Sequence, residues 1–184
     1  TVVLDKTGTL TEGHPQVTDA AWLEEDESSK RILYYLEKMS EHPLAEAIVT
    51  FFENTSAFLK NISAFEVKHF GVLSGRGLEG FVEGKKYYAG NLALLQEKGI
   101  GMDASLQAKA EKWMKEAKTV IAFSDEERVL GVLAITDRLK PTSVQAIEEL
   151  HKQGIEVWML TGDQPEAARE IAQQVGISRF KAGV

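Results

Sequence analysis

The sequence predicts a parallel α/β domain interrupted by an inserted α+β domain. Both ends of the chain alternate short apolar runs with polar loops and helices, the order that is typical of a parallel sheet. The middle has another order: two helices, a glycine-rich series of strands, a helix and two more strands. We therefore expect a domain over residues 1–18 and 135–184, and an inserted domain with an antiparallel sheet over residues 19–134.

The elements expected in the first half follow from the spacing of apolar residues. Thr1–Leu4 is a β-branched apolar run and predicts a buried strand. Ser28 is expected to cap a helix whose apolar residues recur at helical spacing, and Pro43 suits the first position of a second helix. Alternating apolar residues and glycines over 65–90 predict strands, with a hairpin turn at Glu83-Gly84-Lys85.

Six further elements are expected after residue 100, each marked by periodicity or by flanking turn residues. They are a helix over 104–117, strands over 119–123 and 129–135, a helix over 141–152, a strand over 155–160 and a helix over 164–175.

Composition narrows the class of protein. The chain has 184 residues, 21 Lys plus Arg and 28 Asp plus Glu, so its formal net charge is −7. An acidic chain lacks the electrostatic footprint of a nucleic-acid or membrane-surface binder, so we expect no nucleic-acid partner. There is no cysteine, which excludes disulfides and thiolate metal sites within these residues. No apolar run approaches the about 20 residues of a spanning helix, so a soluble, monomeric fragment is expected.

Two polar loops carry the candidate chemistry. Asp5 follows the first expected strand directly, and Thr161-Gly162-Asp163 follows the strand over 155–160. Ligands of open α/β sheets bind at the carboxyl ends of the strands, and in a parallel sheet both loops emerge at the same edge. Backbone N–H groups and hydroxyls in such loops can hold a phosphate.

The run Asp5-Lys6-Thr7-Gly8-Thr9-Leu10-Thr11 resembles the phosphorylation signature of P-type ATPases, whose catalytic domain has the haloacid-dehalogenase-like fold. The resemblance implies that Asp5 is the nucleophile that takes the γ-phosphoryl group of ATP. Asp137, Lys140 and Pro141 match the family's hinge motif. The implied catalytic residues are Asp5, Lys6, Thr7, Thr161, Gly162 and Asp163, with Mg²⁺ at Asp5 and at the Thr7 main-chain carbonyl.

The middle of the chain resembles the nucleotide-binding domain of the heavy-metal P-type ATPases. Ser40-Glu41-His42-Pro43-Leu44-Ala45 is similar to their His-Pro signature, and the glycines from Gly75 onward are similar to their glycine series. By this resemblance Glu37 contacts the adenine edge, and His42 packs against the ring. The implied nucleotide-binding residues are Glu37, His42, Gly75, Gly77, Gly90 and Asn91.

The resemblance implies a metal-exporting pump, with copper(I) favoured by the run over 11–15. Its expected cofactors are ATP and Mg²⁺. Its expected partners are the actuator domain and the metal-transporting membrane helices of the same polypeptide, at the cytoplasmic face of a membrane. The later Mg²⁺-binding motif of the family would lie beyond Val184, so the fragment is expected to bind ATP weakly and turn it over poorly or not at all.

Two other functions stay open. A phosphatase or phosphotransferase of the same fold usually carries a second Asp two residues after the nucleophile, where this chain has Thr7. A non-enzymatic nucleotide-binding module would leave the run that begins at Asp5 without a purpose. The acidic run over 24–27 is interpreted as a solvated loop.

Overall fold

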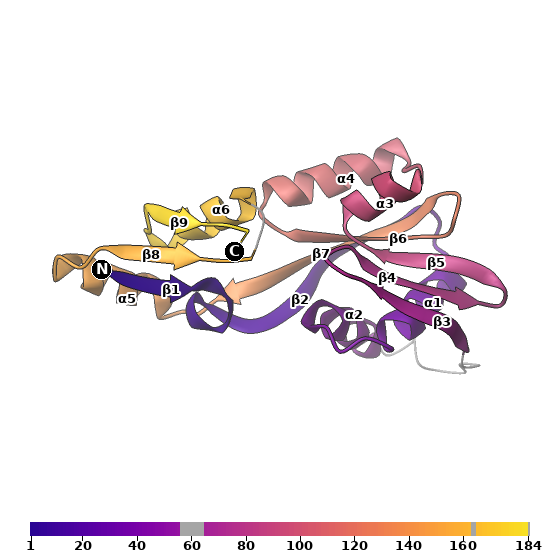
Figure 1. The fold of residues 1–184 in the computed structure, drawn as a ribbon, viewed down its shortest axis with the longest axis horizontal. Helices are drawn as coiled ribbons and strands as arrows, with labels where there is room; N and C mark the ends of the chain where they lie inside the picture. The colour runs from indigo at the N-terminus through magenta and orange to yellow at the C-terminus, as the bar shows by residue number, and fades with distance from the viewer. Residues whose placement is uncertain (56–64, 163–164, 184) are drawn as a thin grey trace. The chain divides into compact units, whose positions relative to one another are not determined.

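The structure is a computed structural model that describes residues 1–55, 65–162 and 165–183 (Figure 1). The chain forms two compact units. The first contains Thr1–Pro15, Lys112–Thr119 and Thr136–Val184, and the second contains Gln16–Glu111 and Val120–Ile135. Lys112–Thr119, which lies within the expected insert, groups with the first unit. None of the helices in the described part of the chain is long and apolar enough to span a membrane.

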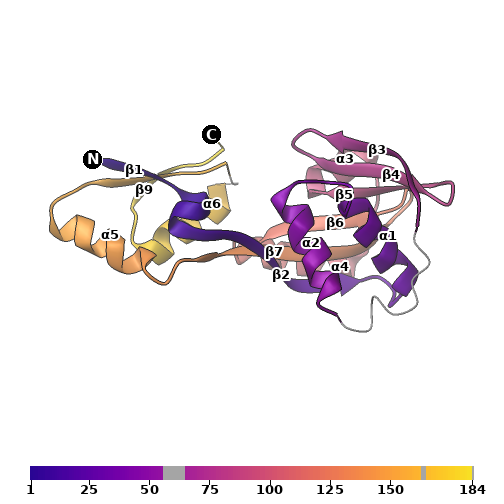
Figure 2. The ribbon, with the colours of Figure 1, turned by 90° about the horizontal axis from the view of Figure 1, so that it is seen from below.

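A three-stranded parallel sheet is the centre of the first unit, with strand order β1-β8-β9. The strands are β1 (Val2–Asp5), β8 (Val157–Leu160) and β9 (Arg179–Lys181). Helices α5 (Ser143–Lys152) and α6 (Pro165–Val175) pack on one face of this sheet (Figure 2). The buried core between sheet and helices contains Leu10, Ile147, Val157, Met159, Ala168, Ala172, Val175 and Ile177.

The expectation of a buried first strand is wrong for half of its residues. Val2 and Leu4 are partly buried, whereas Val3 is 56% exposed. In the described part of the chain β1 pairs only with β8, and the helices cover only one face of the sheet. An apolar run alone does not distinguish a strand covered on both faces from one covered on a single face.

The second sheet has six strands in the order β2-β7-β6-β5-β4-β3. The pairs β3–β4, β4–β5 and β5–β6 are antiparallel, as expected for the insert. The strands are β2 (Thr11–Trp22), β3 (Val67–Leu73), β4 (Gly77–Val82), β5 (Lys85–Gly90), β6 (Thr119–Ser124) and β7 (Val129–Leu139). The expected hairpin turn joins β4 to β5, with positive φ angles at Glu83 and Gly84.

Helices cover the second unit's sheet. Helices α1 (Glu27–Glu37) and α2 (Pro43–Glu53) pack on one face, and α3 (Leu92–Lys98) and α4 (Ala104–Lys115) lie over the other (Figures 1 and 2). The core under α1 and α2 joins apolar residues from both helices to β4, β5, β6 and β7. Trp22 is partly buried and packs against this cluster, with its ring edge-on to that of Phe123 and the ring centroids 6.4 Å apart.

Several local expectations need correction. Asp26, not Ser28, caps α1, because its carboxylate accepts hydrogen bonds from the N–H groups of Ser28 and Ser29. The helix expected at Pro141 begins at Ser143. The expected helix over 164–175 begins at Pro165 in the described chain, and residue 164 lies outside the described residues.

Candidate active site

Asp5 and Thr161 lie at the same edge of the parallel sheet. Asp5 is opposite Leu160 in the β1–β8 register, so Thr161 begins the loop next to Asp5. Asp5 is exposed. Thr161 is buried, with 3% of its surface exposed, and its N–H donates to the Lys181 carbonyl at 3.0 Å. Gly162 is exposed in the same loop, and Asp163 lies outside the described residues.

A tight loop over Lys6–Leu10 connects Asp5 to β2. Gly8 has φ +75° and ψ −12°, a left-handed conformation that glycine adopts without strain. The Thr11 hydroxyl closes the loop: it accepts from the Gly8 N–H at 3.2 Å, and its oxygen is 3.1 Å from the Lys6 carbonyl. The side chain of Leu10 is buried in the unit's core. The loop is therefore fixed at its far end while Asp5 stays accessible.

Asp137 fixes the return path of the chain behind this loop. Its Oδ2 accepts from the Thr11 hydroxyl at 2.6 Å, and its Oδ1 accepts from the Gly13 N–H at 3.0 Å. Lys140 Nζ donates to the Gly8 carbonyl at 2.5 Å. Lys140 thus contacts the loop that follows Asp5, and Asp137 contacts the first residues of β2, directly after that loop.

The donor set at this edge is compatible with Mg²⁺. Mg²⁺ prefers oxygen ligands and is usually held by one or two carboxylates together with substrate phosphates and water. Asp5 is exposed and offers its carboxylate. Thr7, two residues further along the chain, has an extended backbone (φ −74°, ψ 123°) and offers its main-chain carbonyl. Among the described residues, no group of three His, Cys, Asp or Glu side chains is placed to hold a metal ion by itself.

Glu37, at the end of α1, is a buried carboxyl group. It is 4% exposed, and burial raises its pKa from 4.5 to about 8. Desolvation by burial causes this rise in pKa, and no neighbouring charge in the described part of the chain contributes to it. At neutral pH the group is therefore mostly a neutral carboxylic acid, which can both donate and accept a hydrogen bond.

His42 is an exposed residue that caps α2. Its Nδ1 accepts from the Leu44 N–H at 3.2 Å, and Pro43 is the first residue of the helix, as expected. The ring thus has a structural role besides the expected contact with a nucleotide. Within the described chain, no hydrogen bond connects the side chains of Glu37 and His42 to the glycine series.

Gly77 and Gly90 are brought together as a register pair of β4 and β5. A Cβ at Gly77 would lie 2.1 Å from the Ala89 carbonyl oxygen, and one at Gly90 would lie 2.2 Å from the Arg76 carbonyl oxygen. The interpretation that these glycines admit a nucleotide is therefore not required, because the approach of two strands already excludes a side chain at both positions.

Gly75 and Asn91 belong to the same corner. Gly75 has φ +66° and open space where a Cβ would lie. Asn91 Nδ2 donates to the Gly75 carbonyl at 2.9 Å, and Asn91 Oδ1 accepts from the Leu94 N–H at 3.1 Å. Asn91 therefore holds the β3–β4 turn against the start of α3. Helix α3 is absent from the elements expected above, although Asn91 at its start and Gly99 at its end are typical helix-terminal residues.

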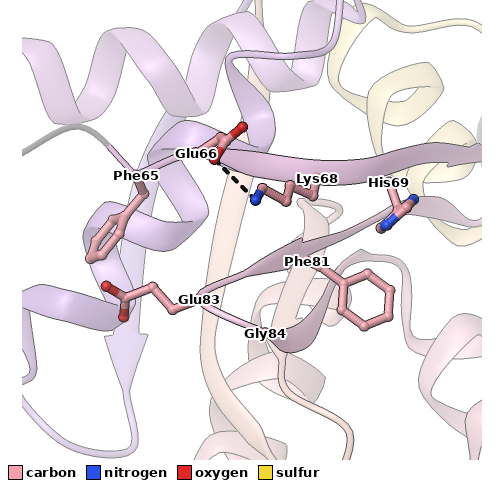
Figure 3. A pocket seen from close by; sticks show the side chains of 7 residues that line it. All are labelled: Phe65, Glu66, Lys68, His69, Phe81, Glu83 and Gly84. Carbon is pink, nitrogen blue, oxygen red and sulfur yellow. Dashed lines mark ion pairs between the residues drawn. The ribbon is translucent and has the colours of Figure 1, made fainter.

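A cavity of about 440 Å³ lies at the other end of the β3–β4 hairpin (Figure 3). None of the residues expected to bind a nucleotide lines it. The close-up shows Phe65 beside Glu83, with His69 and Phe81 on the opposite side and a Glu66–Lys68 ion pair of 3.3 Å. The lining residues are Phe65, Glu66, Lys68, His69, Phe81, Glu83 and Gly84.

The acidic residues over 24–27 form a helix cap and ion pairs at the surface of the second unit. Asp26 caps α1, Lys30 pairs with Glu25 at 2.7 Å and with Glu27 at 2.9 Å, and Glu24 lies 3.4 Å from Arg128. These carboxylates are therefore engaged in capping and ion pairs.

The fold and the residues around Asp5 define a class of protein. The sequence matches the haloacid dehalogenase-like hydrolase family over residues 1–184, and the chain belongs to that family. Its sequence is homologous over its full length to P-type ATPases that are named for copper transport.

Two relatives illustrate this homology. The chain is 42% identical over 185 residues to a copper-exporting P-type ATPase of Vibrio cholerae, covering all of this chain and 20% of the relative. It is 40% identical over 176 residues to the probable copper-importing P-type ATPase A of Enterococcus hirae, covering 96% of this chain and 23% of the relative. The chain thus spans about a fifth to a quarter of the length of these relatives.

Solved structures agree with the fold. A zinc-transporting PIB-type ATPase in its E2.Pi state superposes with a TM-score of 0.70 at 30% identity, over 99% of this chain and 28% of that one. The catalytic CPx-ATPase domain CopB-B gives a TM-score of 0.69 at 26% identity, over 100% of this chain and 60% of that one. The expected fold class is therefore confirmed.

Proposed function

We propose that this chain is the ATP-binding and phosphorylated portion of a heavy-metal P-type ATPase, in which ATP hydrolysis proceeds through an aspartyl-phosphate at Asp5. The observation that carries the proposal is the place of Asp5. It stands at the carboxyl end of β1, exposed, opposite Leu160 of β8 and followed by the Lys6–Leu10 loop. Ligands of parallel sheets bind at this edge.

The proposed reaction is an in-line displacement. A carboxylate oxygen of Asp5 attacks the γ-phosphorus of ATP, the new O–P bond forms, and the bond to the β–γ bridging oxygen breaks as ADP leaves. Lys6 supplies positive charge next to Asp5, and Thr7, Thr161 and Gly162 are proposed to contact the moving phosphoryl group. Mg²⁺, when bound at Asp5 and the Thr7 carbonyl, would neutralise charge on the phosphate oxygens.

We propose that Glu37 and His42 recognise the adenine. The adenine edge presents a donor and an acceptor side by side, and a neutral carboxylic acid at Glu37 is complementary to both. The exposed ring of His42 is available for stacking. Gly75 has open space beside it, so we place the approach of the phosphates there rather than at Gly77 or Gly90.

Copper(I) export is the proposed transport function. Relatives named for copper export and for copper import support copper as the ion, as does the run over 11–15, although one structural neighbour is a zinc-transporting ATPase. The membrane part and the actuator domain of the same polypeptide are the proposed partners.

Two alternatives make different predictions. A free phosphatase of the same family would hydrolyse small phosphate esters and would not require a nucleotide. A nucleotide-binding module would bind ATP without transferring its phosphoryl group. Thr7, in place of a second Asp, favours the pump, because a missing acid/base slows hydrolysis of an acyl phosphate.

Titration of the 184-residue chain with ATP, followed by NMR, tests nucleotide binding. We expect shifts confined to residues 37–91, with the largest at Glu37, His42 and Gly75. ADP should give similar shifts, and p-nitrophenyl phosphate should neither shift these signals nor be hydrolysed. Hydrolysis of the ester with no response to ATP would support the phosphatase instead.

A further inference from the structure

The hydroxyl of Ser143 is a buried polar group that the motifs above do not explain. Ser143 is the first residue of α5 and is 4% exposed. Its Oγ donates a hydrogen bond of 2.7 Å to the carbonyl of Leu10, which is 133 residues away in the chain. The preceding residue, Thr142, makes no side-chain cap to the helix. The Ser143 hydroxyl therefore serves the loop after Asp5 and not its own helix.

The Leu10 carbonyl is held twice. Besides the Ser143 hydroxyl, it accepts from the Lys140 N–H at 3.0 Å. The Ser143 N–H in turn donates to the Lys140 carbonyl at 3.0 Å, which closes a turn at the start of α5. Lys140 Nζ binds the Gly8 carbonyl. One turn thus engages two carbonyl oxygens of the loop.

Side-chain packing fixes the same point. The Leu10 side chain is 3% exposed and lies in the core cluster with Ile147, one helical turn after Ser143. Leu10 is therefore anchored through both its side chain and its carbonyl, five positions after Asp5. A loop fixed at both ends has little freedom to change the position of the residues between them.

We propose that Ser143 is a positioning residue for phosphorylation of Asp5. Its hydroxyl fixes the Leu10 carbonyl and thereby the path of the Lys6–Leu10 loop beside the nucleophile. The inference rests on the proposed function. Ser143 itself does not touch a reacting atom, because its hydrogen bond is to Leu10.

The kinetic test compares Ser143→Ala with Thr142→Ala in the full-length polypeptide. The rate of phosphorylation by saturating ATP should fall about tenfold in Ser143→Ala, because small misplacement at a reacting centre is costly. The ATP concentration for half-maximal rate should be unchanged, since the proposed adenine contacts are in the second unit. Thr142 is exposed and adjacent, so Thr142→Ala should match the wild type. Ser143→Thr keeps the hydroxyl and should restore the rate.

A second measurement needs no nucleotide. Hydrogen exchange of the Gly8 amide, which donates to Thr11 Oγ1, should be faster in the 184-residue Ser143→Ala chain and normal in the Thr142→Ala and Ser143→Thr chains. Normal exchange with a normal phosphorylation rate in Ser143→Ala would overturn the inference. A loss that Ser143→Thr does not restore would also overturn it. Absence of labelling in the wild type would instead overturn the proposed function on which the inference rests.

Discussion

The hydroxyl oxygen of Thr11 lies 2.6 Å from the carboxylate of Asp137, although 126 residues separate them in the chain. The segment between them contains the whole second unit, so this hydrogen bond lies near the points where the chain first leaves and finally re-enters the first unit. The same carboxylate also accepts from the Gly13 N–H. Both hydrogen-bond donors to the Asp137 carboxylate therefore come from residues that are far from it in the sequence.

Asp137→Ala tests this arrangement. Ala has no acceptor, so the Gly13 N–H and the Thr11 hydroxyl would both lose their hydrogen bonds to the carboxylate. A lost hydrogen bond to a charged group costs about 1.5–3 kcal/mol, and we expect the free energy of unfolding of the first unit to fall by at least that amount. Urea unfolding measures it. Glu148→Gln, at an exposed position of α5, is the control and should stay within about 0.5 kcal/mol.

Glu37 makes the stability of the second unit dependent on pH. Its folded-state pKa of about 8 lies above its ordinary value of 4.5, so the native state holds more protons between these values. The free energy of unfolding should therefore fall as pH rises from 4.5 to 8, by about 5 kcal/mol, and level off above 8. Unfolding of Glu37→Gln should lack this slope. An equal slope in both chains would assign it to other groups.

Two substitutions of His42 distinguish its role as the cap of α2 from its proposed role in ATP binding. His42→Ala removes the acceptor for the Leu44 N–H and should cost about 1 kcal/mol of stability. His42→Asn supplies a good helix cap and should restore stability, but not ATP affinity if the ring stacks on adenine. Thermal unfolding and ATP titration of both variants are the measurements. Wild-type ATP affinity in His42→Asn would remove His42 from the proposed site.

Gly77→Ala should destabilise the second unit whether or not ATP is present. The added Cβ would lie 2.1 Å from the Ala89 carbonyl oxygen at a φ of +150°, so β4 and β5 would have to separate. We expect a loss of about 3 kcal/mol or more. Gly101→Ala has open space and an ordinary φ and is the control. A stable Gly77→Ala chain with impaired ATP binding would restore the interpretation of Gly77 as a ligand contact.

Asp5 could be predicted as the candidate nucleophile because the pattern that indicates it lies within a few neighbouring residues. A short apolar run ending at Asp5 predicts a strand end, and a second run predicts the neighbouring strand, whose parallel register the structure confirms. The heavy-metal signature at His42 was also local. Its capping of α2 agrees with Pro43 as the first helical residue.

Other features depend on contacts that are distant in sequence. β2 was not predicted, because its inward positions include Thr11, Gly13 and Pro15 and not an apolar series. The role of Ser143 depends on a carbonyl 133 residues away. The sequence suggests a nucleotide contact for Gly77 and Gly90, because it does not show that the two residues are paired in the β4–β5 register.

The most direct test of the central claim is transfer of label from γ-labelled ATP to Asp5 in the full-length polypeptide. The account predicts an acid-stable phosphoenzyme in the wild type and in Glu12→Gln, an exposed change nearby, and none in Asp5→Asn, which keeps the shape of the side chain but lacks the nucleophilic oxygen pair. Labelling that persists in Asp5→Asn would contradict it.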